Sequence, residues 1–341
     1  MPPSKSPRKE ADEGEERDAK AQKTEDEPRT EAKGPTTGQK AAAAGQGAVP
    51  RDETPRKPLV DGGVRLVHWN VSGLAALLKD EAKRARLTRL IDEERPDVLA
   101  ISEHKISEQK HAAAKADLAA AVPGFSAHWA ICTAKNGYSG VVCLVRDGVE
   151  IVGEPQIDSV CSSLHEGRTV TLELSDCFAI AAYVPNSGQK LERLDYRIGT
   201  WEPAMRSHLE TLGKKKPVVL FGDLNVGHLD ADIWNVKAKH IPKSAGLTPK
   251  ERAAFGQMLE EGPYVDCFRQ LWPEANGCFS FWSTRSGNEV LNRGLRLDYA
   301  VASASVMDGS GPLSLHDCAI LYDYAPRGDH APTLVSLSKT K

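Results

Sequence analysis

The sequence predicts an α/β sandwich that begins at Val64 and continues to the C-terminus. Short apolar runs typical of strands recur throughout this region and are bounded by Gly, Pro and Asn. Short turns join most neighbouring runs, whereas a parallel doubly wound sheet would need a helix between most strands. With 341 residues, the chain is long enough for one large domain or two smaller ones.

Residues 1–60 differ in composition from the rest of the chain. They carry 12 Lys and Arg and 12 Asp and Glu, with almost no large apolar side chains. Such a segment cannot bury enough apolar surface to offset the entropy lost on ordering. We therefore expect a disordered charged arm over residues 1–60 and a folded domain over residues 61–341. The basic clusters SPRK and PRKP fit a nuclear address, contacts with DNA or an ordinary solvated tail.

Composition excludes several classes of protein. The formal net charge is −3, so any surface for nucleic acid must be local. The seven cysteines are odd in number and form no CxxC motif, which fits reduced thiols in a reducing compartment. Because there is neither an apolar run of about 18 residues nor a secretory signal, we expect no membrane span and no secretion. The dinucleotide fingerprint and the Walker phosphate loop are also missing.

The first two strands are followed by polar side chains. Residues 64–70, VRLVHWN, predict a strand that ends at Asn70, and apolar residues at helical spacing over 74–91 predict a helix after it. Pro96 closes the helix, and the strand that follows leads directly into Glu103.

The middle of the chain predicts mainly strands. Four are expected, over residues 125–133, 140–146, 168–174 and 177–184. Tyr183 ends the fourth. An amphipathic stretch over 191–212 follows it, with interruptions at Gly199 and Pro203.

The C-terminal third predicts one capped helix and two strands. Thr248 to Glu251 form a capping box with Pro at the first helical position, so a helix is expected from there to about Glu260. Residues 295–303 predict a strand that carries Asp298, and residues 332–337 predict the last strand.

The central feature is the stretch VVLFGDLNVGH at residues 218–228. Its apolar run predicts a buried strand, and the glycine after it permits a sharp turn that presents Asp223 and Asn225. By themselves these two residues fit an Asx turn as well as a catalytic site. Asn70 and Glu103 also follow strands, however, and three polar strand ends predict a shared rim where a ligand binds.

Eight polar residues at strand ends or in loops are candidates for chemistry. They are Asn70, Glu103, Tyr183, Asp223, Asn225, Asp298, Asp329 and His330. Carboxylates without an excess of His or Cys suit a hard cation such as Mg²⁺ or Mn²⁺, and Asp298 is the best-placed carboxylate to fix the tautomer of His330. Together they fit metal-assisted hydrolysis of a phosphodiester.

Simpler interpretations exist for several of these residues. Tyr183 fits a core residue whose hydroxyl bonds the backbone, and Glu103 fits a salt bridge with Lys105. The Gly-Asp-His sequence near the C-terminus fits a turn. His68 and His128 fit satisfied packing residues.

Several motifs occur in an order that is typical of one family. They are WNVSGL at 69–74, SEHK at 102–105, GYSG at 137–140, YVPNSG at 183–188, GDLNV at 222–226, AGLTPKER at 245–252, FSFW at 279–282, LRLDY at 295–299 and GDH at 328–330. From Val64 to Leu337 the chain resembles the exonuclease III family of apurinic/apyrimidinic (AP) endonucleases, within the endonuclease/exonuclease/phosphatase superfamily. The resemblance implies a two-sheet, four-layer α/β sandwich.

The resemblance also implies roles for the candidate residues. Glu103 would bind the metal ion with Asn70 and Asp329 beside it, and the full ligand set implied is Asn70, Glu103, Asp223, Asn225, Asp329 and His330. Asp223 would position or deprotonate the attacking water, and Asn225 would orient the phosphate. The scissile phosphate would also be contacted by Tyr183, and its oxygens stabilised by His330, oriented by Asp298.

A pocket for the base-less sugar is implied as well. Phe281, Leu295 and Leu297 would line it, and it would be apolar so that a normal base is too large or too costly to enter. Gln189 and Arg285 stand where some relatives place side chains that penetrate DNA.

Three positions depart from the family pattern. Ser72 replaces an Asp on the metal side, which removes an expected carboxylate and predicts weaker metal affinity. His104 replaces a Thr beside the metal-binding Glu. Leu295 replaces a bulky Trp of some relatives, which predicts a roomier pocket.

We therefore expect a magnesium-dependent AP endonuclease of base excision repair. It would incise the backbone 5′ to an abasic site, with 3′-end cleaning and 3′→5′ exonuclease side activities. Its partner would be duplex DNA with abasic sites, bound by a monomer in the nucleus. Acidic residues in the arm argue against a mitochondrial presequence but leave dual targeting open. The alternatives are another phosphatase or phosphodiesterase of the superfamily and a catalytically weakened DNA-binding homologue.

Overall fold

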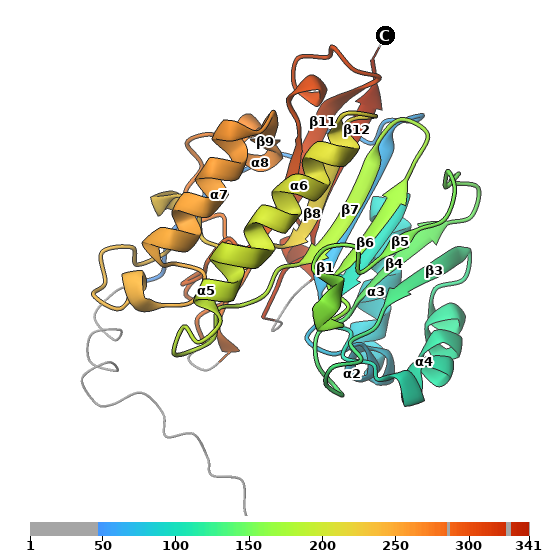
Figure 1. Ribbon diagram of the computed structural model, residues 1–341, viewed down its shortest axis with the longest axis horizontal. Coiled ribbons are helices and arrows are strands. Elements are labelled where there is room, and N and C mark those ends of the chain that lie inside the picture. Colours follow the sequence, from blue (N-terminus) through green and yellow to red (C-terminus); the bar gives the residue numbers. More distant parts are fainter. Residues whose placement is uncertain (1–46, 285–286, 325–328, 341) are drawn as a thin grey trace, which may run out of the picture. The chain divides into compact units, whose positions relative to one another are not determined.

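The computed structural model describes residues 47–284, 287–324 and 329–340. Two six-stranded mixed sheets pack face to face, and helices cover their outer faces (Figure 1). The predicted two-sheet, four-layer α/β sandwich is therefore confirmed. None of the helices within these described ranges is long and apolar enough to cross a bilayer.

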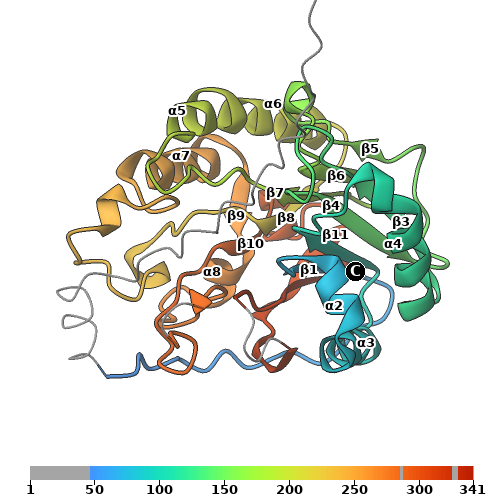
Figure 2. The ribbon, with the colours of Figure 1, turned by 90° about the horizontal axis from the view of Figure 1, so that it is seen from below.

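The first sheet has the strand order β11-β12-β1-β2-β4-β3. Its strands are β1 (Val64–Asn70), β2 (Val98–Ser102), β3 (Phe125–Ala130), β4 (Val141–Arg146), β11 (Leu313–Ile320) and β12 (Thr333–Lys339). Its outer face is covered by α2 (Leu74–Lys79), α3 (Glu81–Glu94) and α4 (Glu108–Ala121). Figure 2 shows these three helices gathered on one side of the fold.

The second sheet has the order β5-β6-β7-β8-β10-β9. Its strands are β5 (Gln156–Ile157), β6 (Thr169–Glu173), β7 (Phe178–Tyr183), β8 (Val218–Asp223), β9 (Tyr264–Asp266) and β10 (Asp298–Ser303). Its outer face packs against the long α6 (Glu202–Gly213) and α7 (Pro249–Glu261). The remaining helices are α5 (Leu194–Tyr196), the π-turn η2 (Arg197–Trp201), α8 (Cys267–Leu271) and the short 3₁₀ turns η1 (Ser162–Leu164), η3 (Asp230–Asp232), η4 (Ile241–Lys243), η6 (Ala304–Val306) and η7 (Tyr322–Tyr324).

Strand alternation directs the polar residues into the layer between the sheets. In β1, Leu66 belongs to the core between the sheets and Val67 belongs to the core under the helices. Successive side chains of a strand point to opposite faces, so Asn70 faces the second sheet as Leu66 does. By the same rule Asp223 of β8 shares the face of Phe221 and points toward the first sheet. The two sheets therefore present polar side chains to each other at one end.

Two helical predictions need correction. The helix expected over 74–91 is two helices, because Asp80 has extended backbone and its side chain accepts a hydrogen bond from Lys83 N at 3.0 Å, which caps α3. The interruptions expected at Gly199 and Pro203 are absorbed by η2, whose wider turn continues directly into α6. Helix α4 and strands β5, β9 and β11 were not predicted.

The boundary expected at residue 60 also needs correction. Residues 47–60 belong to the same compact unit as the rest of the domain, while residues 1–46 lie outside the described residues. Figure 2 shows this segment, in blue, running along one edge of the domain toward α3. Asp52 N donates to Asn276 O at 3.0 Å, and the Arg51 guanidinium lies 3.5 Å from the centre of the Tyr322 ring. Such polar and cation–π contacts leave no apolar pattern in the sequence.

Two truncations should distinguish the contribution of residues 47–60 to stability from that of residues 1–46. Arg56 bonds the buried carboxylates of Glu94 at 3.0 Å and Asp317 at 2.9 Å, and its own side chain is 34% exposed. Deleting residues 1–60 should lower the free energy of unfolding by about 2 kcal/mol, because both carboxylates lose a partner. Deleting residues 1–46 removes none of these contacts and should leave urea unfolding unchanged. Arg56→Ala should reproduce most of the loss, and Lys57→Ala, at an exposed neighbour, should not.

Candidate active site

The strand ends of the two sheets meet at one rim. In the first sheet β1 and β2 run parallel, with Asn70 opposite Ser102, and Glu103 follows directly. In the second sheet β7 and β8 run parallel, and Asp223 lies opposite both Tyr183 and Asp298. The structure therefore brings together polar residues that the sequence places at separate strand ends.

The Asn70 side chain links the two sheets across this rim. Its Nδ2 donates to Glu103 Oε1 at 3.1 Å and to Asp223 Oδ2 at 2.9 Å, and its Oδ1 accepts from Ser72 N at 3.0 Å. Glu103 has a left-handed φ of 51°, a conformation that costs free energy for a residue with a Cβ. The carboxylates of Glu103 and Asp223 therefore share one amide donor.

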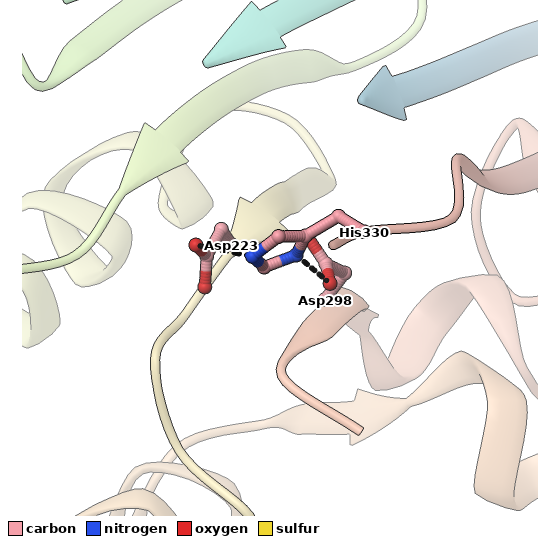
Figure 3. Close-up of side chains that lie close together, drawn as sticks. All are labelled: Asp223, Asp298 and His330. Atoms are coloured by element: carbon pink, nitrogen blue, oxygen red, sulfur yellow. Dashed lines mark hydrogen bonds and ion pairs between the residues drawn. The ribbon is translucent and has the colours of Figure 1, made fainter. Parts of the chain in front are cut away.

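Asp223, His330 and Asp298 form a buried cluster (Figure 3). His330 Nδ1 lies 2.8 Å from Asp298 Oδ2, and His330 Nε2 lies 3.8 Å from Asp223 Oδ2. Burial alone would lower the pKa of His330, but the charges of Asp298 and Asp223 outweigh it and raise the pKa to about 10. Burial raises the pKa of Asp223 to about 7 against the opposing charge of His330, and Asp298 adds to the rise. The imidazole is thus a cation held between two carboxylates.

Asn225 forms the Asx turn that the sequence allowed. Its backbone N–H donates to Asp223 Oδ1 at 2.9 Å, which is an Asx turn, and its φ is 51°. Its Nδ2 donates to Val184 O at 2.9 Å, and its Oδ1 accepts from Asn186 Nδ2 at 3.0 Å. The turn therefore orients the Asp223 carboxylate and fixes the Asn225 amide next to it.

Tyr183 is buried at the end of β7, with its hydroxyl against the Glu103 carboxylate. Burial raises its pKa well above the usual range, and the charges of Glu103 and Asp223 add to the shift, so the hydroxyl keeps its proton. Arg168, which the sequence analysis missed, donates to Tyr183 O at 3.0 Å and lies 4.8 Å from its ring centre. Glu166 in turn pairs with Arg168 Nε at 2.5 Å.

Apolar side chains lie beside the histidine. Phe281 and Leu295 exchange two backbone hydrogen bonds of 2.9 Å, and the rings of Phe281 and His330 are 4.9 Å apart. Leu297 N donates to Ser280 Oγ at 3.0 Å, and the same hydroxyl donates to Asp298 Oδ2 at 2.7 Å. The expected wall of the pocket is therefore attached directly to the polar residues.

The other predicted site residues are less closely tied to this cluster. Asp329 is half-buried beside His330, and its carbonyl accepts from Trp282 N at 2.8 Å. Gln189 is exposed in the turn after β7. Arg285 lies outside the described residues.

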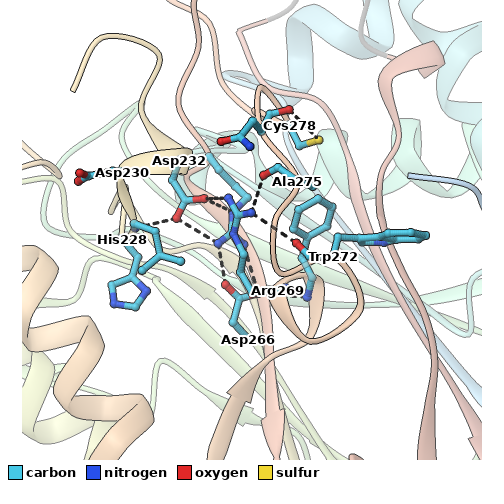
Figure 4. A network of polar contacts seen from close by, with 12 residues as sticks. His228, Asp230, Asp232, Asp266, Arg269, Trp272, Ala275 and Cys278 are labelled. Atoms are coloured by element: carbon cyan, nitrogen blue, oxygen red, sulfur yellow. Dashed lines mark hydrogen bonds and ion pairs between the residues drawn. The ribbon is translucent and has the colours of Figure 1, made fainter. Parts of the chain in front are cut away.

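A buried network of two arginines and two aspartates lies beside the residues expected to line the pocket (Figure 4). Arg296, between Leu295 and Leu297, bonds Asp232 at 2.8 and 3.1 Å and Asp266 at 2.6 and 3.2 Å. Arg269 adds a bond of 2.5 Å to Asp232. No local pattern in the sequence marks this network, since each member alone reads as an ordinary surface charge.

His104 is buried behind Glu103 as a neutral ring. Its Nδ1 accepts from Ile106 N at 2.9 Å and its Nε2 lies 3.1 Å from Ala130 O, so one N–H and one lone pair satisfy both partners. Burial lowers its pKa to about 4. At this position the structure gives a packing role to the residue that departs from the family pattern.

This burial predicts a loss of stability in mild acid. Unfolded chains protonate His104 below about pH 6.5, whereas the folded protein stays neutral to about pH 4, so stability falls as the pH falls across that window. The loss from this residue should be about 2 kcal/mol between pH 7.5 and pH 5. Urea unfolding at pH 7.5 and pH 5 measures it, and His104→Gln should remove that part of the difference. An equal difference in parent and variant would contradict the prediction.

Comparison with known proteins identifies the family. The model of the endonuclease/exonuclease/phosphatase family matches residues 67–317. The chain belongs to this family. It is 36% identical over 267 residues to the DNA repair nuclease APEX1 of Danio rerio, covering 77% of this chain and 80% of that protein. It is 34% identical over 273 residues to an exodeoxyribonuclease of Bacillus subtilis, covering 79% and 97%.

A solved structure agrees with these relatives. The crystal structure of an AP endonuclease from Leishmania major superposes with a TM-score of 0.71 at 28% identity, covering 88% of this chain and 98% of that one. The resemblance to exonuclease III-type AP endonucleases seen in the sequence is thereby confirmed.

Proposed function

We propose that this protein is an AP endonuclease, which hydrolyses the phosphodiester 5′ to an abasic site in duplex DNA and leaves a 3′-hydroxyl and a 5′-deoxyribose phosphate. The observation that carries the proposal is the buried set Asp223, His330 and Asp298 with the apolar ring of Phe281 beside it. The relatives named as AP endonuclease and DNA repair nuclease support the same reaction.

Asp223 is suited to act as the general base. Its Oδ1 is held by the Asn225 N–H and its Oδ2 by the Asn70 amide, so the carboxylate is fixed at the rim. A pKa raised to about 7 allows it to accept a proton from water near neutral pH. The water oxygen then attacks phosphorus, the bond from phosphorus to the 3′-oxygen breaks, and the 3′-oxygen takes up a proton from solvent to become the 3′-hydroxyl.

His330 is suited to stabilise the charge on the phosphate. Asp298 accepts the Nδ1–H, which leaves the Nε2–H of the cationic ring to donate to a phosphoryl oxygen. The hydroxyl of Tyr183, which is still protonated, offers a second hydrogen-bond donor at the same rim. These donors are already fixed by the fold, so little reorganisation is needed in the transition state.

The site fits a divalent metal ion. The carboxylates of Glu103 and Asp223 converge on one amide, a donor set of oxygens that suits Mg²⁺, with Mn²⁺ as a substitute. Glu103 would hold the ion with Asn70 and Asp329 beside it. When bound, the ion would withdraw charge from the phosphoryl oxygens.

Recognition of the abasic site would depend on Phe281, Leu295 and Leu297. An apolar wall accepts a sugar without a base, while a normal base would leave its polar edge unpaired there. The same site would also process a 3′ phosphodiester, so 3′-end cleaning and exonuclease activity are proposed as side activities. We place the protein, as a monomer, in base excision repair in the nucleus.

A single oligonucleotide assay tests the function. A duplex with one tetrahydrofuran abasic analogue is incubated with Mg²⁺ and with EDTA. This analogue cannot undergo β-elimination, so a cut requires hydrolysis. One cut 5′ to the analogue that EDTA abolishes supports the proposal, whereas activity only on small phosphate esters would assign the protein to a phosphatase branch.

The proposed metal site predicts that substitution of Ser72 changes the affinity for Mg²⁺. Lys105 Nζ lies 2.7 Å from Glu103 Oε2 and 3.2 Å from Ser72 Oγ, so the ammonium faces a hydroxyl where some relatives have a carboxylate. Ser72→Asp should lower the Mg²⁺ concentration for half-saturation about 10-fold, because it adds a charged ligand. Asp and Asn tolerate the φ of 49° at this position. Calorimetric Mg²⁺ titration measures the change, and the uncharged Ser72→Asn should show little; equal values for both variants would contradict the prediction.

A further inference from the structure

A second histidine, His68, lies next to Asp298, the carboxylate that bonds His330. His68 is on β1, two residues before Asn70 and on the same face of the strand, and it is 1% exposed. Its Nε2 lies 2.9 Å from Ser102 Oγ, and its Nδ1 lies 3.4 Å from Asp298 Oδ1. The ring therefore stands between a strand-end serine of the first sheet and the carboxylate that holds His330.

The Asp298 carboxylate is satisfied on one oxygen only. Its Oδ2 accepts from Ser280 Oγ at 2.7 Å and from His330 Nδ1 at 2.8 Å. Among the described residues, Asp298 Oδ1 and His68 Nδ1 are both buried without a well-formed hydrogen bond, and they face each other. A buried polar atom without a partner costs free energy, so each is the natural partner of the other.

The surroundings select one tautomer of His68. A neutral imidazole carries one N–H, so the tautomer decides which of the two neighbours receives it. With the proton on Nε2, the lone pair of Nδ1 would face the Asp298 carboxylate and be repelled. With the proton on Nδ1, the ring donates to Asp298 Oδ1 and accepts the Ser102 hydroxyl at Nε2. The second arrangement satisfies every group.

We propose that His68 is a positioning residue, whose Nδ1–H holds Asp298 Oδ1 and thereby fixes the angle at which Asp298 presents His330. Asp298 is then held by donors from three segments: His68 of β1, Ser280 before the pocket wall, and His330 before β12. Free rotation of this carboxylate would swing the imidazole away from Asp223, 3.8 Å from its Nε2. The loss of activity expected from this rotation rests on the function proposed above, but the position of His330 does not.

Two substitutions separate the two nitrogens of the ring. The amide nitrogen of Asn occupies about the place of Nδ1, and that of Gln about the place of Nε2. His68→Asn can therefore still donate to Asp298, while His68→Gln can reach Ser102 but not Asp298. The pair is matched in chemistry and differs in which contact it keeps.

The first readout is the proton NMR signal of the His330 Nδ1–H and the ring ¹⁵N shifts, recorded without DNA or metal. We expect both signals near their parent positions in His68→Asn and displaced in His68→Gln. The second readout is steady-state incision, in which kcat should fall about 10-fold in His68→Gln with KM within 2-fold, and should stay within about 2-fold of the parent in His68→Asn. Thermal unfolding verifies that both variants fold.

The outcomes distinguish the inference from the function. Parent-like signals and kcat in His68→Gln would overturn the positioning role, as would equal losses in both variants. A displaced signal in His68→Gln alone, with no incision even by the parent, would support the role of His68 and reject the proposed activity. If His68→Gln fails to fold, Ser102→Ala gives the second test: it removes only the Nε2 partner and should leave the His330 signal in place, and a displacement there would count against the proposal.

Discussion

Asp223→Asn is expected to lower the single-turnover rate of incision about 10³-fold, the loss typical of removing a general base. The amide has nearly the shape of the carboxylate but cannot accept the proton of the attacking water. It also turns one of its two oxygens into a donor, which then faces the N–H of either Asn70 or Asn225. Binding of DNA depends mainly on phosphate contacts elsewhere and should change little.

The measurement uses enzyme in excess over a duplex with one tetrahydrofuran, and anisotropy in EDTA for binding. Asp230→Asn is the matched control, because that carboxylate also follows β8, is 75% exposed and pairs with Arg252 at 2.6 Å. It should cut within about 2-fold of the parent, since exposed pairs contribute little. Equal rates for Asp223→Asn and Asp230→Asn would reject Asp223 as the base, whereas no incision even by the parent would favour a DNA-binding homologue without catalysis.

The same substitution should remove a pH-dependent loss of stability. The pKa of Asp223 is raised to about 7 in the folded protein, so the ionised carboxylate is disfavoured there relative to the unfolded chain. Stability from this group is lost as the pH rises from about 4 toward 7, and an uncharged amide does not titrate. The fall in Tm between pH 4 and pH 7 should therefore be smaller in Asp223→Asn than in the parent, and an equal fall would contradict the prediction.

The strand ends were predictable from the sequence because their signal is local. Alternating apolar residues closed by Gly or Pro mark a strand, and the polar residue that follows it is visible at once, as with Asp223. The pairing of those ends was not visible. Asn70 and Asp223 are 153 residues apart in sequence, and only the packing of the two sheets brings them to 2.9 Å. The shared rim followed from strand direction alone, whereas its distances depended on the fold.

Residues whose role depends on a contact formed in the fold could not be predicted, for the same reason. One histidine within an apolar strand has the pattern of a packing residue, so His68 gave no sign of its contact with Asp298. Its position two residues before Asn70, on the same face, was the one available signal. Arg296 reads as a surface charge because its carboxylates lie on other elements. Arg168 reads as one because its bond to the Tyr183 carbonyl spans 15 residues. Polar contacts likewise hold residues 47–60, which composition alone assigned to the arm.

Arg296→Ala is expected to cause the largest loss of stability, about 3–5 kcal/mol, because it leaves buried carboxylates without their main partner. Asp232 and Asp266 would keep Arg269 and backbone contacts only. Leu295 and Leu297 flank Arg296, so the wall of the pocket should loosen as well. Urea unfolding measures the loss, and Arg252→Ala is the control, since its exposed pair with Asp230 should contribute at most about 1 kcal/mol.

The pH at which the protein unfolds in acid should change in Arg296→Ala. Burial would raise the pKa of Asp232, but Arg296 and Arg269 outweigh it and lower the pKa to about 2. A carboxyl whose pKa is depressed by folding stabilises the protein above about pH 4, and this contribution is lost as the pH falls toward 2. Without Arg296, burial dominates and Asp232 takes up its proton at higher pH. The midpoint of acid unfolding, followed by tryptophan fluorescence, should therefore rise in Arg296→Ala and stay at the parent value in Arg252→Ala. An unchanged midpoint in Arg296→Ala would mean that Arg269 alone keeps Asp232 ionised, and that the network has one dispensable cation.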